Sequence, residues 1–391
     1  MRRLVYCFDG TWNDDSGNSP ITNVVKLHRS VLPEDAAGNQ QIAHYMIGIA
    51  TAFKGRARFL MGAAGIEVGA RILAAYRQLI AEYRPGDQIY LFGFSRGAFE
   101  ARSLASFIAM FGIGREDQGF SVDKAWTLYR LHRARQVRAL LSPLRAASHY
   151  PVRIKCIGVW DTVGNLGNPL VPGGMLTRSL RYHDAHLPTI VDVGLHALSI
   201  DENRGPFSPT LWTLKKGADL APGQMIEQVW FAGSHADVGG GYEESELSDI
   251  SLLWMAERCM ATTGLALDLE LLRETTEPKP LGLQHEADTG RIYGWSRLLP
   301  FVRFIEQDRR ALSPTRRAVL GTWRTNRLPP DEVSLNERVH ESALERFGKR
   351  VPAKSGDTLR EVTYRPRNLA TRVDASAGLV ADATGGHVRL K

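Results

Sequence analysis

One segment constrains the fold of this chain more than any other. Residues 88–98 read Gln-Ile-Tyr-Leu-Phe-Gly-Phe-Ser-Arg-Gly-Ala, an apolar strand pattern that runs directly into a helical pattern. Glycines two positions either side of Ser95 would let the strand and the helix pass close together. Such a turn lifts a serine hydroxyl above a sheet edge and points helical N–H groups at the atom it attacks. The segment therefore predicts a nucleophile elbow at Ser95, the alternative being a plain strand–turn–helix with a buried serine.

Strands and helices alternate on both sides of this elbow. Strand patterns occupy residues 4–8, 41–49, 152–160 and 227–232, residues 193–200 fit a helix or a strand, and helical patterns occupy 22–32, 65–83, 98–111, 122–141 and a segment that we expect Ser248 to cap. Strands that are apolar throughout are typical of a buried parallel sheet. The predicted fold class is therefore α/β, a mainly parallel sheet with helices on both faces.

The pattern weakens after about residue 265. We expect a core over residues 1–265, interrupted at about 165–190 by a loop-like insertion or cap that is rich in Gly, Pro and His. Residues 266–391 are interpreted as a helical and irregular C-terminal extension packed on the core, and residues 265–330 are a second candidate for cap material. The tail from about residue 370 is small and polar, and we expect it to be disordered.

Reactive side chains follow several of the predicted strands. Asp9, Ser95, Asp161 and His235 each come directly after an apolar run. The carboxyl ends of parallel strands meet at one edge of the sheet, where chemistry gathers in such folds. A serine needs a base, and the base needs an orienting carboxylate. Ser95, Asp161 and His235 stand in the chain order nucleophile, acid, histidine and are predicted to form a catalytic triad.

Two further residues have alternative interpretations. Asp237 could replace Asp161 as the acid, although two residues from His235 it has difficulty reaching round to Nδ1. We expect Asp237 to brace the glycine-rich loop 239–241 or to help bind a cation. His196 lies inside an apolar run and is interpreted as a hydrogen-bonded support residue rather than as the base.

An oxyanion hole requires two backbone N–H donors. Arg96, directly after the nucleophile, should supply one of them. The loop after the first strand should supply the other, from Gly10 or Thr11, with Asp9 as a supporting residue. The alternative for these three residues is an ordinary turn with an Asx hydrogen bond.

Composition and motifs limit which partners, cofactors and other enzyme classes fit this sequence. The formal net charge of +7 favours loose attraction to anionic surfaces such as phospholipid headgroups. The three cysteines, Cys7, Cys156 and Cys259, are widely spaced and suggest neither a disulfide framework nor a zinc site. We expect no metal, no cofactor and no nucleic-acid partner. A phosphatase of the haloacid-dehalogenase type is disfavoured, because its nucleophilic aspartate would stand where this chain has Cys7. A nucleotide-binding fold is disfavoured as well, because no phosphate-binding glycine motif follows the first strand.

Five blocks of sequence resemble a known family. They are Phe8–Asn13, Gly93–Ala98, Val159–Gly164, His196–Glu202 and His235–Tyr242, and 364–369 resembles a sixth. Together they resemble the uncharacterised α/β-hydrolase domain family, which includes phospholipase effectors of bacterial type VI secretion. The resemblance implies an α/β-hydrolase-like core and a serine ester hydrolase that uses Ser95, Asp161 and His235.

The resemblance also implies a substrate and partners. Lipid or phospholipid acyl esters are the expected substrates, cleaved through an acyl-enzyme, with peripheral contact to an anionic membrane. If the protein is an effector, we expect a cognate inhibitor (immunity) protein. The N-terminus shows no Sec-type signal peptide, so we expect synthesis in the cytoplasm and, for an effector, export without a cleavable signal. The alternative function is a non-catalytic binding or interaction module on a hydrolase fold.

Overall fold

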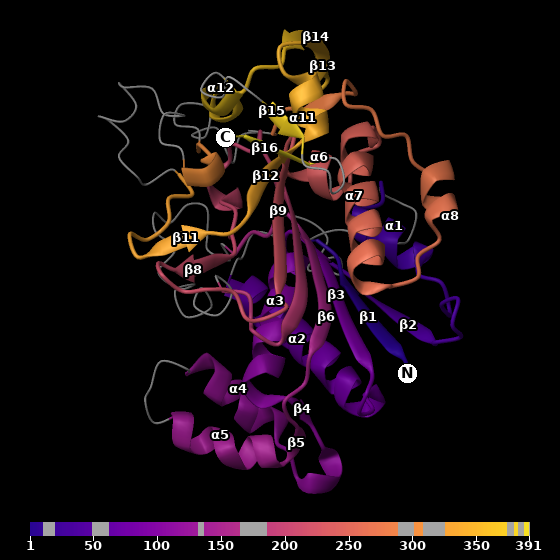
Figure 1. The fold of residues 1–391 in the computed structure, drawn as a ribbon, viewed down its shortest axis with the longest axis vertical. Helices are drawn as coiled ribbons and strands as arrows, with labels where there is room; N and C mark the ends of the chain where they lie inside the picture. Colours follow the sequence, from indigo (N-terminus) through magenta and orange to yellow (C-terminus); the bar gives the residue numbers. More distant parts are fainter. Residues whose placement is uncertain are drawn as a thin grey trace.

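A nine-stranded sheet forms the centre of the molecule (Figure 1). The computed structural model describes residues 1–10, 20–48, 62–131, 137–164, 186–287, 301–307, 325–373, 379–381 and 387–390. Within them the strand order is β15-β16-β12-β9-β7-β6-β3-β1-β2. Neighbours from β12 to β2 are parallel, whereas β16 pairs antiparallel with β12 and β15. The strands are β1 (Arg3–Phe8), β2 (Gln41–Met46), β3 (Gln88–Phe94), β6 (Ile154–Trp160), β7 (Val191–Ser199), β9 (Met225–Phe231), β12 (Glu337–His340), β15 (Leu379–Ala381) and β16 (His387–Leu390).

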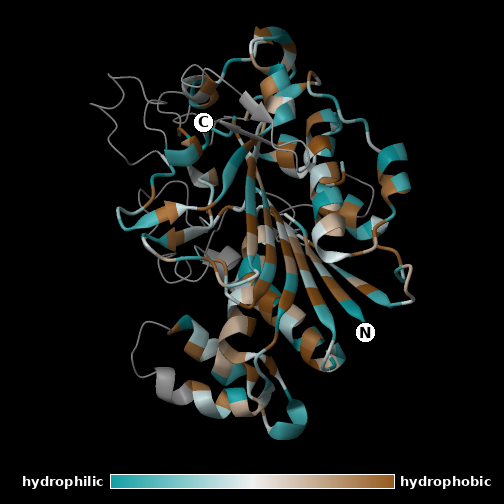
Figure 2. Cartoon of the chain, in the orientation of Figure 1, coloured by the Kyte–Doolittle hydropathy of each residue, from teal (hydrophilic) through white to brown (hydrophobic). Residues whose placement is uncertain are grey.

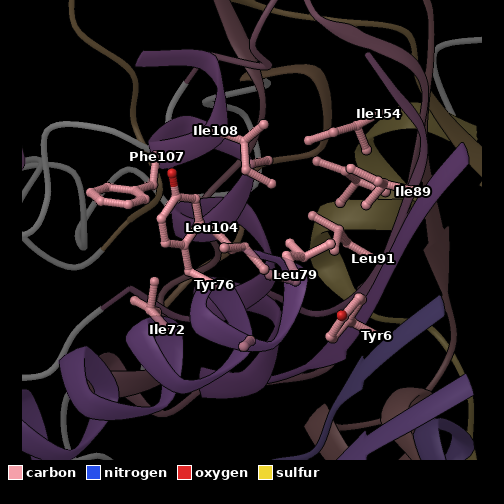
Figure 3. Close-up of a cluster of buried hydrophobic side chains, with 14 of the residues drawn as sticks. Tyr6, Ile72, Tyr76, Leu79, Ile89, Leu91, Leu104, Phe107, Ile108 and Ile154 are labelled. Carbon is pink, nitrogen blue, oxygen red and sulfur yellow. The ribbon is translucent and has the colours of Figure 1, made fainter. Parts of the chain in front are cut away.

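Helices cover both faces of this sheet. The helices are α1 (Asn23–Ser30), α2 (Gly62–Glu82), α3 (Arg96–Phe111), α4 (Val122–Arg130), α5 (Val137–Ala146), α6 (His235–Gly239), α7 (Glu246–Thr263), α8 (Leu269–Glu274), α11 (Glu341–Arg346) and α12 (Arg367–Val373). Alternate side chains of β1 point to opposite faces: Leu4 and Tyr6 pack with α2 and α3 (Figure 3), whereas Val5 and Cys7 pack with α1 and α7. Burial on both faces explains why brown, hydrophobic bands recur along the strands of the sheet, with teal bands only at single polar residues and strand ends (Figure 2).

The chain reverses its direction of travel across the sheet at β1. It runs from β1 to β2 on one side and then crosses back to β3 on the other side of β1. In open α/β sheets, ligands bind outside the carboxyl ends of the strands at such a switch point. Ser95 follows β3 and Asp9 follows β1, so the predicted chemistry lies at this point of the fold.

The described residues also form smaller elements. They are the pairs β4 (Ile113–Gly114) with β5 (Ser148–His149) and β8 (Thr213–Lys215) with β11 (Glu332–Ser334), the sheet of β10 (Gln284–His285), β13 (Arg350–Ser355) and β14 (Thr358–Thr363), and three 3-10 turns at Glu116–Gln118, Gly205–Phe207 and Ile305–Gln307. Among the described residues, no helix has both the length and the apolarity that crossing a bilayer requires.

The structure corrects the predicted elements in two places. Ser248 does not cap its helix: Ser245 is the N-cap of α7, and the Ser248 hydroxyl donates to the Ser245 carbonyl oxygen at 3.0 Å inside the first turn. Residues 266–391, predicted to be helical and irregular, contribute β12, β15 and β16 to the main sheet. The predicted insertion lies largely outside the described residues, as do Thr11 and parts of the tail.

Candidate active site

Ser95 lies on a tight turn between β3 and α3. Its backbone has φ 59° and ψ −119°, a left-handed conformation that is costly for a residue with a Cβ. The flanking glycines allow the close approach that the sequence predicted. A Cβ on Gly97 would lie 2.2 Å from the carbonyl oxygen of Phe8, and a Cβ on Gly93 would lie 2.5 Å from that of Gly97. The strand and the helix therefore present Ser95 above the sheet, where its side chain is almost buried.

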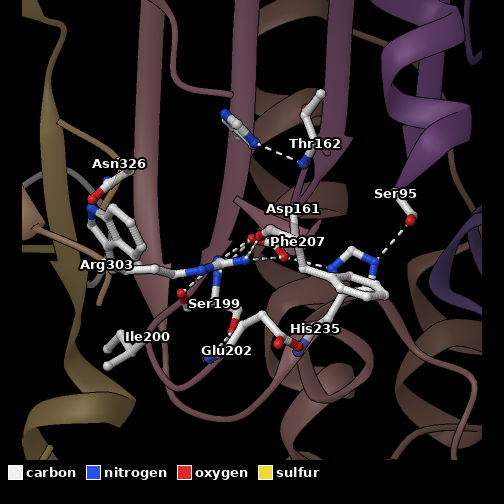
Figure 4. A network of polar contacts seen from close by, with 12 residues as sticks. Ser95, Asp161, Thr162, Ser199, Ile200, Glu202, Phe207, His235, Arg303 and Asn326 are labelled. Atoms are coloured by element: carbon white, nitrogen blue, oxygen red, sulfur yellow. Dashed lines mark hydrogen bonds and ion pairs between the residues drawn. The ribbon is translucent and has the colours of Figure 1, made fainter. Parts of the chain in front are cut away.

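Ser95, His235 and Asp161 form a continuous hydrogen-bonded row (Figure 4). His235 Nδ1 lies 2.5 Å from Asp161 Oδ2, and His235 Nε2 lies 2.8 Å from Ser95 Oγ. A carboxylate only accepts, so Nδ1 donates to it and Nε2 of the neutral ring accepts the serine proton. The three residues come from the ends of β3, β6 and β9, as the sequence predicted.

Asp161 is fully buried at the end of β6. Its Oδ1 accepts from the backbone N–H of Ser199 at 3.1 Å and from Arg303 Nη1 at 2.6 Å, and its Oδ2 accepts from Arg303 Nη2 at 2.9 Å. Burial alone would raise the pKa of Asp161, but the Arg303 charge and the hydrogen bonds from His235 and Arg303 lower it well below its usual range. The carboxylate is therefore held ionised and in one orientation.

His235 is the first residue of α6 and is enclosed by aromatic rings. Its ring lies 4.6 Å from that of Phe94 and packs edge-on to that of Phe207 at 4.9 Å, measured between centroids. Its backbone N–H donates to Glu202 Oε2 at 3.3 Å, and Arg204 Nη2 donates to the same oxygen at 2.7 Å. The loop after β7 thus fixes where the helix that carries His235 begins.

His196 supports the acid loop. It is fully buried on β7, and its Nε2 accepts the backbone N–H of Thr162, the residue after Asp161, at 3.2 Å. Its Nδ1 therefore donates to Gln228 Oε1, 3.3 Å away. Burial lowers the pKa of His196 to about 3, so the ring is neutral. This geometry matches the support role that the sequence predicted.

The Asp237 side chain does not bind His235 Nδ1. It binds Ser234, the residue before His235, and so braces the loop between β9 and α6. Its Oδ2 accepts from the backbone N–H and hydroxyl of Ser234 at 2.8 and 3.0 Å. Its Oδ1 lies 2.7 Å from Nδ1 of His285, whose Nε2 lies 3.2 Å from Glu244 Oε2. Of the two acids that the sequence allowed, Asp161 is the one that contacts His235. Within the described ranges, no group of His, Cys, Asp and Glu side chains could hold a metal ion.

The backbone N–H of Gly10, which was predicted to be an oxyanion donor, is used within the loop after β1. Gly10 follows β1, but its backbone N–H donates to Asp9 Oδ1 at 2.6 Å. Asp9 is buried and also accepts from Tyr45 and Thr22, and burial raises its pKa to about 6. The Gly10 amide is thus directed at Asp9 rather than at a substrate. Arg96 opens α3 directly after Ser95, and Thr11 lies outside the described residues.

Two residues of the site were missed from the sequence. Glu202 belongs to a block singled out for its resemblance, but no role had been assigned to it. Arg303 lies 142 residues from Asp161 in a stretch without a clear period. Its neighbours Phe301, Val302, Phe304 and Ile305 are apolar, and a charge placed among such residues signals a buried ion pair. That local signal could have identified it, although not its partner.

Comparisons with known proteins give one family and several distant relatives. The family described as "T6SS, Phospholipase effector Tle1-like, catalytic domain" matches residues 2–258. An uncharacterized protein of Saccharomyces cerevisiae is 28% identical over 234 residues, which cover 54% of this chain and 33% of the yeast protein.

Two solved structures are also similar. An uncharacterized protein from Pseudomonas aeruginosa has a TM-score of 0.45 at 19% identity, over 76% of this chain and 50% of that one. The Tle1 effector bound to the VgrG spike of the type 6 secretion system has a TM-score of 0.35 at 20% identity, over 62% and 52%. The chain thus covers only 33% of the length of the yeast protein. It covers 50% of the Pseudomonas aeruginosa chain and 52% of the Tle1 effector chain.

Proposed function

This chain belongs to the family of Tle1-like type VI secretion phospholipase effectors through their catalytic domain, and on that premise we propose that it is a serine hydrolase of carboxylic esters. The row from Ser95 through His235 to Asp161 carries the proposal. It unites a strained serine, a neutral histidine that accepts its proton and a buried carboxylate that orients the ring. These are the three roles that nucleophilic acyl transfer requires.

The proposed reaction follows from these positions. Ser95 Oγ attacks the ester carbonyl carbon while His235 Nε2 takes the hydroxyl proton. The tetrahedral intermediate collapses when His235 returns that proton to the leaving alkoxide, which departs as an alcohol and leaves an acyl-enzyme. A water molecule, deprotonated by the same nitrogen, then attacks the acyl carbon. His235 passes that proton to Ser95 Oγ as the bond between Oγ and the acyl carbon breaks, which releases the carboxylic acid and restores the serine.

The oxyanion that forms in each half-reaction needs donors. Arg96 begins α3, so its backbone N–H stands at a helix N-terminus next to the nucleophile. Since the Gly10 amide donates to Asp9, we assign the second donor to Thr11. That assignment rests on its position in the sequence.

The proposed substrate class is the acyl ester of a phospholipid. Family membership supports a lipid ester, and the net charge of +7 favours anionic headgroups at a membrane surface. For an effector, export by a contractile machine and a cognate inhibitor protein follow as further proposals.

Hydrolysis assays test this function. The wild-type protein and Ser95→Ala are compared on short-chain and long-chain p-nitrophenyl esters and on vesicles of phosphatidylglycerol or phosphatidylcholine. We expect ester turnover that Ser95→Ala abolishes and faster release of fatty acid from the anionic vesicles. A binding module without catalysis would leave every ester intact, and an activity that survives Ser95→Ala would exclude Ser95 as the nucleophile.

A further inference from the structure

Arg303 is buried behind the acid of the triad, on the side away from Ser95 (Figure 4). The residue is 1% exposed, and its two terminal nitrogens make four hydrogen bonds. Two go to the Asp161 oxygens, at 2.6 and 2.9 Å, and two go to the carbonyl oxygens of Ser199 at 2.8 Å and Phe207 at 2.7 Å. A planar guanidinium matches a carboxylate in this two-point geometry, which a lysine ammonium cannot reproduce.

The backbone around Arg303 is fixed independently of the ion pair. The N–H of Phe301 donates to the carbonyl oxygen of Asn203 at 2.8 Å, in the loop after β7. The N–H and carbonyl of Phe304 are both bonded to the side chain of Asn326, at 2.5 and 3.0 Å. Backbone hydrogen bonds therefore anchor the chain before and after Arg303, and the side chain reaches Asp161 from between them.

The hydrogen bonds of Arg303 affect the position of His235 as well as that of Asp161. Asp161 Oδ2 binds both Arg303 and His235 Nδ1, so a rotation of the carboxylate would break both contacts. Arg303 also holds the carbonyl of Phe207, whose ring packs on His235. Loss of Arg303 would thus loosen the imidazole on two sides.

The charge of Arg303 has its own consequence. With Arg303 positive, Asp161 negative and His235 neutral, this buried cluster is neutral, and a further proton makes it positive. Without Arg303 the same proton would neutralise a buried negative charge, which is easier. Glu202 with Arg204 on the His235 side, and His196 with Arg102 beyond Asp161, are the other charged or titratable groups nearby. The Arg303 charge contributes to lowering the pKa of both Glu202 and His196, although burial and Arg102 act more strongly on His196, and Arg204 acts more strongly on Glu202.

We propose that Arg303 is a positioning residue of the hydrolase, which fixes the Asp161 carboxylate in the orientation that His235 Nδ1 requires. The inference rests on the proposed function. It extends the site beyond residue 258, where the family match ends, into the C-terminal segment.

The test compares Arg303→Met, Arg303→Lys and Arg303→Ala with the control Arg346→Met. Arg346 is another buried arginine of the C-terminal segment, and it donates to the carbonyls of Pro280 and Gly282. Folding is checked by circular dichroism and urea denaturation. Then kcat, KM and the pH dependence of kcat/KM are measured with a p-nitrophenyl ester.

We expect Arg303→Met to lower kcat by roughly 10²-fold with little change in KM, as misplacement of a catalytic group does. The midpoint of its acidic limb should rise by about 1–3 pH units. Arg303→Lys should lose kcat but keep the acidic limb near that of the wild type, because it retains the charge. Arg346→Met should lose stability without either change. Guanidinium ion at millimolar concentration should restore part of the kcat of Arg303→Ala.

Each outcome bears on one of the two proposals. An inactive wild-type protein would refute the proposed function itself. An active wild type whose Arg303 variants keep both kcat and the acidic limb would overturn the role of Arg303. A loss of kcat equal to that of Arg346→Met, with no shift in pH and no rescue, would reduce Arg303 to a structural residue. If Arg303→Met does not fold, Arg303→Lys and the rescue of Arg303→Ala decide.

Discussion

Replacing Asp161 by asparagine separates the catalytic role of this carboxylate from its structural one. The two side chains have the same shape, but one oxygen becomes an NH₂ donor. On the Oδ1 side the new donor would face N–H groups of Ser199 and Arg303, and on the Oδ2 side it would face those of Arg303 and His235. In both orientations two donors oppose each other, so Asp161→Asn cannot keep the wild-type network.

The loss of activity should be large. With an amide in place of the carboxylate, His235 no longer has an acceptor that selects the Nδ1–H tautomer or a charge that stabilises the imidazolium. A change of this kind lowers kcat by about 10⁴-fold, equivalent to about 5.4 kcal/mol of transition-state stabilisation at 1.36 kcal/mol per tenfold. The measurement is kcat on a p-nitrophenyl ester at saturating concentration.

The loss of stability should be separable. Asp161→Asn leaves the guanidinium of Arg303 buried without its counter-charge, which costs about 3–5 kcal/mol. Adding Arg303→Met to the same chain removes that charge. Urea denaturation should therefore show that the double variant regains most of the lost stability, while kcat stays low.

Asp237→Asn is the matched control, because Asp237 is equally buried and hydrogen-bonded but does not touch His235 Nδ1. It should lose about 1–3 kcal/mol of stability and keep kcat within tenfold. A near-wild-type rate for Asp161→Asn, together with an inactive Asp237→Asn, would refute the assignment of the acid.

Three further predictions concern packing and pH. Gly97→Ala should lower Tm and kcat together, because its Cβ would lie 2.2 Å from the carbonyl oxygen of Phe8, and both are measured on the purified variant. Burial alone lowers the pKa of His285, but its carboxylate partners Asp237 and Glu244 raise it above the ordinary value. The charged imidazole therefore stabilises the fold fully below the unfolded pKa of about 6.5, and this stabilisation is lost as pH rises through the folded pKa. The free energy of unfolding in urea should thus differ more between wild type and His285→Gln at pH 5.5 than at pH 9, and an equal difference would contradict this. Burial raises the pKa of Glu100 to about 8, so wild-type stability should fall as pH rises from about 4.5 to 8. Glu100→Gln should be more stable relative to wild type at pH 9 than at pH 5 in the same assay, and an unchanged difference would exclude that cause.

The features that the sequence predicted well have local causes. Ser95, Asp161 and His235 each follow a strand whose apolar run is visible in the sequence, and the parallel sheet brings these strand ends to one edge. The glycines around Ser95 reflect a close approach of strand and helix within a few residues. Such features need no knowledge of distant parts of the chain.

The features that the sequence missed depend on distant contacts. The side chain of Arg303 is defined by Asp161, 142 residues away, and no local period links them. β12 contains only four residues, Glu-Arg-Val-His, and only its pairing with β9 makes it a strand of the main sheet. The Gly10 amide was a reasonable oxyanion donor from its position, but the carboxylate of the preceding residue accepts it. Ser248 was predicted to cap α7, but the helix begins at Glu246, so that Ser245 occupies the N-cap position.

Labelling by a fluorophosphonate tests the central claim most directly, because it reports an activated serine without requiring the natural substrate. The protein is labelled at neutral pH, digested, and the modified peptide is identified by mass spectrometry. We predict stoichiometric labelling of wild type at Ser95 and none of Ser95→Ala. A folded wild-type protein that takes no label, or a label that persists in Ser95→Ala, would contradict the account.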